Sequence, residues 1–164
     1  MDASTHLAGR TRETKIRRDA RGRWFDGDHA LEHPKLTQAF DRWLERAPDG
    51  RFCLKNDINW AYVEVEGPAR FVRGVRSDGQ GLRLTLDNDT EVALEPEALV
   101  ADPEGVLHQR LPERMVARFE SGATVALAEW LGERLREADS GIVLDLEGGP
   151  YRVPVVDDPL ASQR

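Results

Sequence analysis

Two stretches of the chain decide the fold, DARGRWFDGDHALEHPKLTQAFDRWL (Asp19–Leu44) and ADPEGVLHQRLPERMVARFESGATVALAEWL (Ala101–Leu131). Each opens on an Asp-x-x-Gly turn, passes through a short apolar patch and a proline, and ends on a helix-like run that closes in Trp-Leu. A turn at a fixed offset before a helical run is typical of one supersecondary unit. We therefore expect one structural unit written twice. Chance similarity is the alternative, because the identities are few and turn motifs are common.

The segments within and after the first stretch predict a helix and a hairpin. A proline at the first helical position and apolar residues at helical spacing predict a helix over 34–46. The run 52–65 has strand-like ends around the turn residues 56–59, which predicts a β-hairpin. Short strands are expected ahead of the helix, at 14–18 and 23–25.

The rest of the chain predicts a meander, further helices and a closing hairpin. Strands at 71–76, 82–86 and 91–94 are separated by turn residues, as in an antiparallel meander. Apolar spacing over 112–135 predicts two helices, or one helix kinked at its Ser-Gly pair. A second hairpin is expected at 142–153.

Together these elements predict an α+β fold. Two related turn-strand-helix-hairpin units are joined by an antiparallel meander, and short helices pack on a mixed or antiparallel sheet. The expected organisation is a disordered tail at 1–12, an N-terminal unit at 13–68, the meander at 69–100, a C-terminal unit at 101–156 and a frayed tail at 157–164.

Composition narrows the class of protein. The chain has 164 residues, of which 40% are hydrophobic and 32% charged, a profile typical of a globular protein that needs no disulfide or metal to fold. It has no apolar run long enough for a membrane helix and no secretion signal. The single cysteine, Cys53, suits a reducing compartment and is interpreted as a small buried hydrophobe. We therefore expect a cytoplasmic protein with no membrane partner.

The charge is uneven along the chain. Residues 10–23 have a local balance of +5, so the remainder carries −12 of the net charge of −7. A basic arm can bind nucleic acid, but the acidic body repels phosphate and the arm lacks interleaved aromatic residues. Nucleic acid is therefore an unlikely partner, and we expect the arm to fold against its own acidic body.

No motif in the chain predicts catalysis. His29-Ala30-Leu31-Glu32-His33 spells the H-x-x-E-H pattern of inverted zinc proteases, which requires both histidines on one helix. Pro34 follows directly and disfavours helical angles at His33, so two exposed histidines near a helix cap are the expected reading. Carboxylate pairs such as Asp145 and Glu147 suit the wet faces of strands. We expect no enzyme activity, no metal and no cofactor.

The segments RDARGRWFDGDHALEHPKLTQAFDRWL (18–44) and DGRFCLKNDINWAYVEVEGPARFV (49–72) resemble the bacterial family labelled domain of unknown function 1285, and the similarity extends over 15–135. Gly67 stands where that family usually has an acidic residue, and the family's C-terminal motif is absent. The residues that carry the resemblance are Arg18, Asp19, Gly22, Trp24, Phe25, Gly27, Val65, Glu66, Pro68 and Phe71.

The resemblance implies a duplicated α+β core whose C-terminal part is superficially pleckstrin-like. It also implies a candidate ligand site between the two halves, for a nucleobase-like molecule, and a regulatory role in signal transduction. The leading hypothesis is therefore a non-enzymatic small-ligand module. The alternative is a protein-interaction or scaffold module without a small ligand.

The candidate site residues lie mainly in the first hairpin loop. Asn56, Asp57 and Asn59 offer hydrogen-bond donors and acceptors beside the indole of Trp60, a combination that suits a planar heterocycle. Arg118, expected on the second helical stretch, could add charge to the same crevice. The alternative is a loop whose Asx side chains bond their own backbone while Trp60 packs on the core. The other tryptophans, Trp24, Trp43 and Trp130, are expected in the core.

Overall fold

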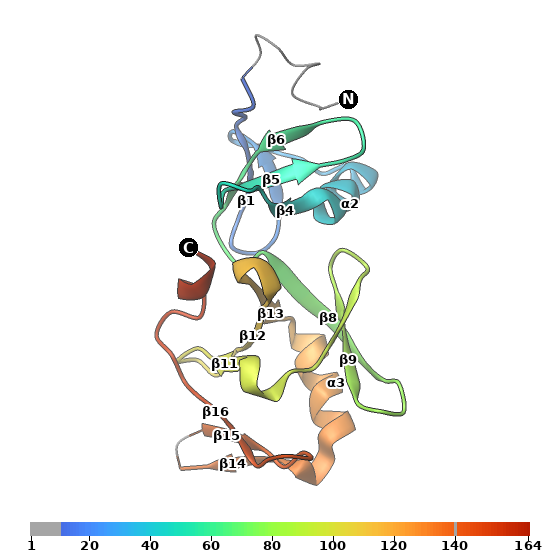
Figure 1. Ribbon diagram of the computed structural model, residues 1–164, viewed down its shortest axis with the longest axis vertical. Coiled ribbons are helices and arrows are strands. Elements are labelled where there is room, and N and C mark those ends of the chain that lie inside the picture. The colour runs from blue at the N-terminus through green and yellow to red at the C-terminus, as the bar shows by residue number, and fades with distance from the viewer. Residues whose placement is uncertain (1–10, 140) are drawn as a thin grey trace. The chain divides into compact units, whose positions relative to one another are not determined.

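The computed structural model describes residues 11–139 and 141–164, and the chain divides into unit 1 (Met1–Gly67) and unit 2 (Pro68–Arg164) (Figure 1). Each unit combines antiparallel strand pairs with one α-helix and one parallel pair, so the fold is α+β with mixed sheets, as predicted. The two units are described in turn.

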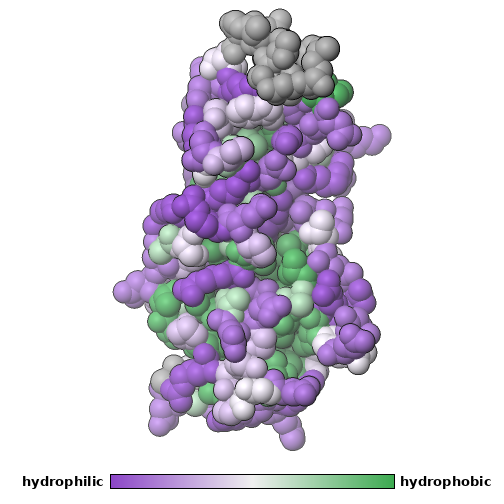
Figure 2. All heavy atoms as spheres, in the orientation of Figure 1, coloured by the Kyte–Doolittle hydropathy of each residue, from purple (hydrophilic) through white to green (hydrophobic). Residues whose placement is uncertain are grey.

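Unit 1 contains a four-stranded sheet in the order β3-β2-β1-β7 and a three-stranded sheet in the order β4-β5-β6. On the face drawn in Figure 2 its surface is mostly hydrophilic. Its core is formed by Trp24, Phe40, Leu44, Leu54 and Val63. In chain order the elements are β1 (Ile16–Arg18), β2 (Trp24–Asp26), β3 (His29–Ala30), α2 (Pro34–Trp43), β4 (Leu44–Arg46), β5 (Phe52–Lys55), β6 (Trp60–Tyr62) and β7 (Glu64–Val65).

Unit 2 contains a six-stranded sheet in the order β10-β9-β8-β13-β12-β11 and a three-stranded sheet in the order β14-β15-β16. The predicted meander is confirmed, because β8, β9 and β10 pair antiparallel in sequence. The strands are β8 (Arg70–Ser77), β9 (Leu82–Leu86), β10 (Glu91–Ala93), β11 (Leu99–Ala101), β12 (Leu107–Leu111), β13 (Met115–Phe119), β14 (Leu135–Ala138), β15 (Gly141–Leu144) and β16 (Tyr151–Val153). The helices are α3 (Ser121–Leu131) and the 3₁₀ turns η1 (Pro96–Ala98), η2 (Pro112–Arg114), η3 (Gly132–Arg134) and η4 (Ala161–Gln163).

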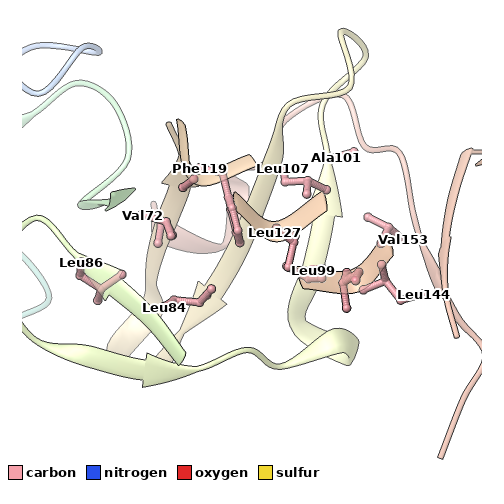
Figure 3. Close-up of a cluster of buried hydrophobic side chains, with 13 residues drawn as sticks. Val72, Leu84, Leu86, Leu99, Ala101, Leu107, Phe119, Leu127, Leu144 and Val153 are labelled. Atoms are coloured by element: carbon pink, nitrogen blue, oxygen red, sulfur yellow. The ribbon is translucent and has the colours of Figure 1, made fainter. Parts of the chain in front are cut away.

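The apolar core of unit 2 is larger than that of unit 1. Leu127 on α3 is fully buried against the sheet residues Val72, Leu84 and Phe119, and the last sheet contributes Leu144 (Figure 3). Because α3 ends at Leu131 and the chain then turns back into β14, one cluster joins both sheets of this unit to the helix. Burial of this apolar surface is the main stabilising term available to the unit.

The predicted helix over 34–46 is too long by three residues. α2 ends at Trp43, and Leu44 has the extended backbone (φ −67°, ψ 124°) that begins β4. Leu44 is 1% exposed and pairs with Leu54 of β5. The helical spacing of apolar residues extends beyond the end of the helix, because the first residue of β4 is buried in the same core as the helix.

The helical prediction for 112–135 is wrong at both ends. Met115–Phe119 form β13, which pairs in parallel with β8 and antiparallel with β12, and Leu135 begins β14. When a short apolar run is buried on both faces, the spacing of its apolar residues does not distinguish a strand from a helix. Only the segment from Ser121 to Leu131 is an α-helix, and it starts at the predicted Ser-Gly pair.

The first Asp-x-x-Gly turn is held by its own aspartate. The Asp19 N–H donates to the Arg23 carbonyl at 2.9 Å, and the Gly22 N–H donates to the Asp19 carbonyl at 3.0 Å. One Asp19 carboxylate oxygen accepts from the backbone N–H groups of Arg21 (3.0 Å) and Arg23 (2.8 Å). Gly22 has a φ of 85°, which is why the turn requires glycine there.

The second turn repeats these bonds. The Asp102 N–H donates to the Val106 carbonyl at 3.0 Å, and the Gly105 N–H (φ 86°) donates to the Asp102 carbonyl at 2.9 Å. One carboxylate oxygen of Asp102 accepts from the backbone of Glu104 (3.0 Å) and Val106 (2.9 Å). The Asp-x-x-Gly signature therefore specifies one turn geometry at both places, while the duplication of the whole unit stays a prediction.

Both expected tails depart from the prediction where the structure describes them. Residues 1–10 lie outside the described residues, but Arg12 accepts a bond from the Tyr62 N–H at 2.9 Å through its carbonyl and belongs to unit 1. At the other end, Gln163 is 5% exposed, and its side-chain oxygen accepts from the backbone N–H groups of Ala69 (2.8 Å) and Val116 (3.1 Å). The segment 157–164 is thus held against the rest of unit 2, because the side chain of Gln163 accepts hydrogen bonds from two buried backbone N–H groups.

Candidate functional site

The predicted loop residues lie together at the β5–β6 turn of unit 1. One side-chain oxygen of Asn56 accepts from the backbone N–H groups of Ile58 and Asn59, both at 2.9 Å. The Asn59 side-chain oxygen accepts from the Trp60 N–H at 2.8 Å, and Asp57 is exposed. The two amide oxygens therefore stabilise the turn itself, which was the alternative interpretation of this loop.

The indole of Trp60 is covered on one face. The guanidinium of Arg12 lies 3.9 Å from the ring centroid, and its Nη1 donates to the Trp60 carbonyl at 2.7 Å. Tyr62 meets the ring edge-to-face at 5.0 Å. A hollow of about 190 Å³ beside Trp60 is lined also by Glu45, Ala47, Pro48, Cys53 and Lys55. That volume is below the roughly 300–1,000 Å³ of typical small-molecule sites.

Cys53 does not make this hollow reactive. The residue is 2% exposed within β5, as predicted for a small buried hydrophobe. Burial, together with the negative charge of Glu45, raises the pKa of the Cys53 thiol to about 11. A thiol with that pKa is protonated at neutral pH and is a poor nucleophile.

Arg118, the fifth predicted residue, lies in unit 2. It is on β13 rather than on a helix, and it stands opposite His108 of β12 in the antiparallel register. The proposed ligand residues are thus divided, with Asn56–Trp60 in one unit and Arg118 in the other. The crevice between the halves stays a prediction.

A larger hollow, of about 510 Å³, lies within unit 2 and was not predicted. Its volume is within the range of small-molecule sites. The lining comes from the β8–β9 turn, the segment before η1, the end of α3 with η3, and the β15–β16 turn. These residues are Ser77, Gly79, Gln80, Gly81, Leu82, Leu94, Pro96, Trp130, Leu131, Arg134, Leu146, Glu147 and Tyr151.

Trp130 presents an exposed indole to this hollow. Its side chain was expected in the core, but the residue is 47% exposed. The ring is nevertheless held in place, because its N–H donates to the Val75 carbonyl of β8 at 3.1 Å. An aromatic surface that is open yet fixed is suited to stacking on a planar ligand.

Two polar side chains at the hollow are anchored by backbone carbonyls. Arg134 donates through Nε to the Leu131 carbonyl at 3.3 Å and through Nη2 to the Trp130 carbonyl at 3.0 Å. The Tyr151 hydroxyl donates to the Glu147 carbonyl at 3.1 Å. Both side chains are therefore positioned before any ligand arrives.

The sequence did not separate Trp130 from the core residues of α3. Ala123, Leu127 and Leu131 recur every four residues and are the buried residues of α3. Trp130 follows Ala123 by seven residues, a spacing that belongs to the same helical face. Helical spacing alone therefore predicts a core position, and the exposure of Trp130 depends on how the neighbouring segments pack.

The H-x-x-E-H residues do not form a zinc-protease helix. His29 lies in β3, His33 is the extended residue before α2, and both are exposed. The two imidazoles therefore lack the shared helical face that the motif requires. Within residues 11–139 and 141–164, no group of three or more His, Cys, Asp or Glu side chains is arranged to hold a metal ion.

In the described part of the chain, no helix combines the length and the hydropathy needed to cross a bilayer.

Comparisons with known proteins show the fold. No family model and no curated protein matches the sequence. The structure is similar to a DUF1285 family protein from Silicibacter pomeroyi DSS-3, with a TM-score of 0.63 and 17% identity over 88% of this chain and 82% of that one. It is also similar to a DUF1285 family protein from Shewanella baltica OS155, with a TM-score of 0.55 and 13% identity over 71% of this chain and 91% of that one.

The chain therefore has the fold of these uncharacterised DUF1285 family proteins, in agreement with the family resemblance of its sequence. Gly67, a departure from the family pattern, has a structural explanation. A Cβ atom there would lie 2.6 Å from the Ala20 Cα and 3.0 Å from its carbonyl oxygen. Because both are backbone atoms, the turn at Ala20 would have to shift to accept any side chain at position 67.

Proposed function

We propose that the protein is a non-enzymatic cytoplasmic module that binds a small planar ligand, such as a nucleobase-like molecule, in a regulatory role. We place the site at the 510 Å³ hollow of unit 2 rather than at the hairpin loop of unit 1. The observation that carries the proposal is Trp130, which lines a ligand-sized hollow, is 47% exposed as a residue, and has its indole fixed by a bond to Val75.

The loop of unit 1 supports this choice by contrast. Its amide oxygens are used by the turn, one face of Trp60 is already covered by Arg12, and the adjacent hollow has only about 190 Å³. A planar ligand could stack on the face that Arg12 covers only by displacing that side chain.

The polar groups of the larger hollow favour binding over catalysis. A nucleophile in an active site is usually bonded to a side-chain base. The Tyr151 hydroxyl donates to a backbone carbonyl, and the Arg134 guanidinium is anchored by two carbonyls. These arrangements position side chains but do not activate them.

The test is a thermal-shift screen of nucleobases, nucleosides and common planar metabolites. A ligand at 100 times its Kd stabilises the folded state by about 2.7 kcal/mol, which raises the Tm of a chain of this size by roughly 5–11 °C. We expect the shift to disappear in Trp130→Ala and to remain in the matched variant Trp60→Ala. Loss of the shift in Trp60→Ala alone would return the site to the hairpin loop.

A second variant protects this test against a folding defect. Gly81 lines the hollow, and a Cβ atom there would meet no atom within 4 Å, so Gly81→Phe adds bulk without a backbone clash. We expect Gly81→Phe to keep its unliganded Tm and to lose the ligand-induced shift. Both variants retaining the full shift would contradict the proposed site.

A protein-interaction module is the second candidate. Val125 on α3 is 58% exposed, Trp130 on the same helix is 47% exposed, and Figure 2 shows apolar residues gathered at the surface of unit 2. Apolar surface of this kind is common at interaction sites. The absence of any thermal shift across the panel, with a change in self-association on Val125→Asp, would favour this candidate.

A further inference from the structure

We infer that the ligand of the Trp130 hollow is an aromatic acid, whose ring stacks on the indole and whose carboxylate binds Arg134. This inference rests on the proposed function and adds the chemical class of the ligand. It depends on three features of the hollow. These are its apolar lining residues, the fixed guanidinium of Arg134, and the absence of an ion pair to that guanidinium among the described residues.

Part of the lining suits an apolar ring. Leu82, Leu94, Leu131, Leu146 and Pro96 line the hollow together with the rings of Trp130 and Tyr151. A ligand that fills such a space gains from burial of its own apolar surface, and a flat ring gains further from contact with the indole.

The guanidinium of Arg134 has donors to spare. Arginine carries five N–H donors, and only one N–H of Nε and one of Nη2 are bonded to carbonyls. These two bonds fix the plane of the group and leave three N–H donors. Preorganised guanidinium donors of this kind bind carboxylates strongly.

The charge of Arg134 is also not neutralised by an ion pair. Among the described residues no carboxylate lies within 4.0 Å of it, and the Glu147 carboxylate of the same lining is farther away than that. Arg136, two residues along the chain, is different: it makes a two-point pair with Asp145, at 2.8 Å and 3.4 Å. Arg136 therefore provides a matched arginine whose anion is already supplied by the protein.

The test compares ligands that share a ring and differ only in charge. Isothermal titration would use indole-3-acetate, indole-3-acetamide and tryptamine, with 2-naphthoate and 2-naphthamide as a second series. A hydrogen bond to a charged group changes affinity about 10- to 100-fold. We expect each acid to bind at least tenfold more tightly than its amide, and tryptamine to bind most weakly.

Single variants test which residue is responsible for the preference for acids over amides. Arg134→Gln should remove the acid-over-amide preference, Arg134→Lys should restore part of it, and Arg136→Gln should retain it in full. Glu147→Gln should tighten the acids severalfold, because a negative charge in the lining is removed. If Arg134 served only to cap α3, Arg134→Gln would lower the Tm and leave the preference unchanged.

Other outcomes separate this inference from the proposed function. Amides that bind as tightly as acids, or tryptamine as the tightest ligand, would overturn the acid assignment while the hollow remained a binding site. No binding by either series would also overturn it. The proposed function itself fails only if the wider thermal-shift panel gives no ligand that depends on Trp130.

Discussion

Unit 1 has a buried charge pair beside its Asp-x-x-Gly turn and covers Trp60 with an arginine, whereas unit 2 has apolar residues at the matching turn positions and leaves Trp130 partly exposed. In unit 1, Arg18 precedes the first Asp-x-x-Gly turn, is 1% exposed and pairs with Asp41 at 3.1 Å. The Trp24 indole N–H donates to the same carboxylate oxygen at 2.8 Å. In unit 2, the residues at the same offsets from the second turn are Ala101 and Leu107, both buried.

Two tryptophans outside the core clusters follow the same contrast. Trp60 of unit 1 has Arg12 stacked on it, and Trp130 of unit 2 faces a hollow. The turn geometry is common to both units, so the difference comes from the side chains placed on it. The comparison teaches that the same backbone turn occurs in both units, and that the side chains around it determine which unit exposes an aromatic surface to a ligand.

The largest effect is expected from breaking the buried charge pair of unit 1. Asp41→Ala leaves Arg18 without its buried carboxylate and Trp24 without its acceptor, which should lower the free energy of unfolding by about 3–5 kcal/mol in urea titrations. The double variant Arg18→Met with Asp41→Leu should recover a large part of that loss, because an apolar pair carries no desolvation cost. A loss in Asp41→Ala below about 1 kcal/mol would show that the pair is not what holds this core together.

The two turns provide the next test, because they share one pattern of bonds. Asp19→Ala and Asp102→Ala each remove an oxygen that accepts two backbone N–H groups, and each should cost about 1–2 kcal/mol. Asp19 should cost more, since it also pairs with the Arg23 guanidinium at 2.9 Å. Equal stability of wild type and Asp102→Ala would mean that the second turn does not depend on its aspartate.

Lowering the pH should reduce the stability of the protein through Asp19 of unit 1. Its partial burial favours the neutral form, but hydrogen bonds from the Arg23 backbone and guanidinium and the Arg21 backbone outweigh this, so the pKa of Asp19 is lowered. A lowered folded-state pKa stabilises the protein above the unfolded value of about 3.9, and this stability is lost as the pH falls through the folded value. Asp19→Asn cannot titrate, so its difference in unfolding free energy from wild type should shrink between about pH 5 and pH 2. A difference independent of pH would contradict this coupling.

The smallest effect is expected at the covered indole. Arg12→Ala removes a cation–π contact and should cost about 0.5–1 kcal/mol. The more sensitive measurement is acrylamide quenching of tryptophan fluorescence, which should increase because Trp60 loses its cover. Combining Arg12→Ala with Trp60→Phe should abolish the increase. An increase that persists in the double variant would place the newly exposed indole elsewhere.

The sequence predicted elements whose period and end signals agree. The hairpin of β5 and β6, the meander of β8 to β10 and the start of α2 at Pro34 all combine a clear pattern with strong turn or capping residues. The run Met115–Phe119 was misassigned because it is buried on both faces, and its strand character comes from pairing with β8, which is distant in sequence. Local pattern contains no information on such a neighbour.

The candidate site was harder to predict than the fold. The polar loop Asn56–Asn59 looked suited to a heterocycle, but residues that favour turns also satisfy their own backbone. The hollow beside Trp130 is assembled from segments between residues 77 and 151, so its existence depends on tertiary packing alone. Helical spacing placed Trp130 on the buried face of α3, so its exposure, like the position of Arg134, depended on the fold of the surrounding chain.

The most direct test of the ligand hollow is a two-dimensional ¹⁵N NMR spectrum of the tryptophan indole N–H groups, recorded with and without the best compound of the thermal-shift panel. The chain has four tryptophans, and single Trp→Phe variants assign their signals. The account predicts that the Trp130 signal shifts in proportion to ligand occupancy while the Trp60 signal stays in place. A shift of the Trp60 signal with an unchanged Trp130 signal would contradict it and place the ligand in unit 1.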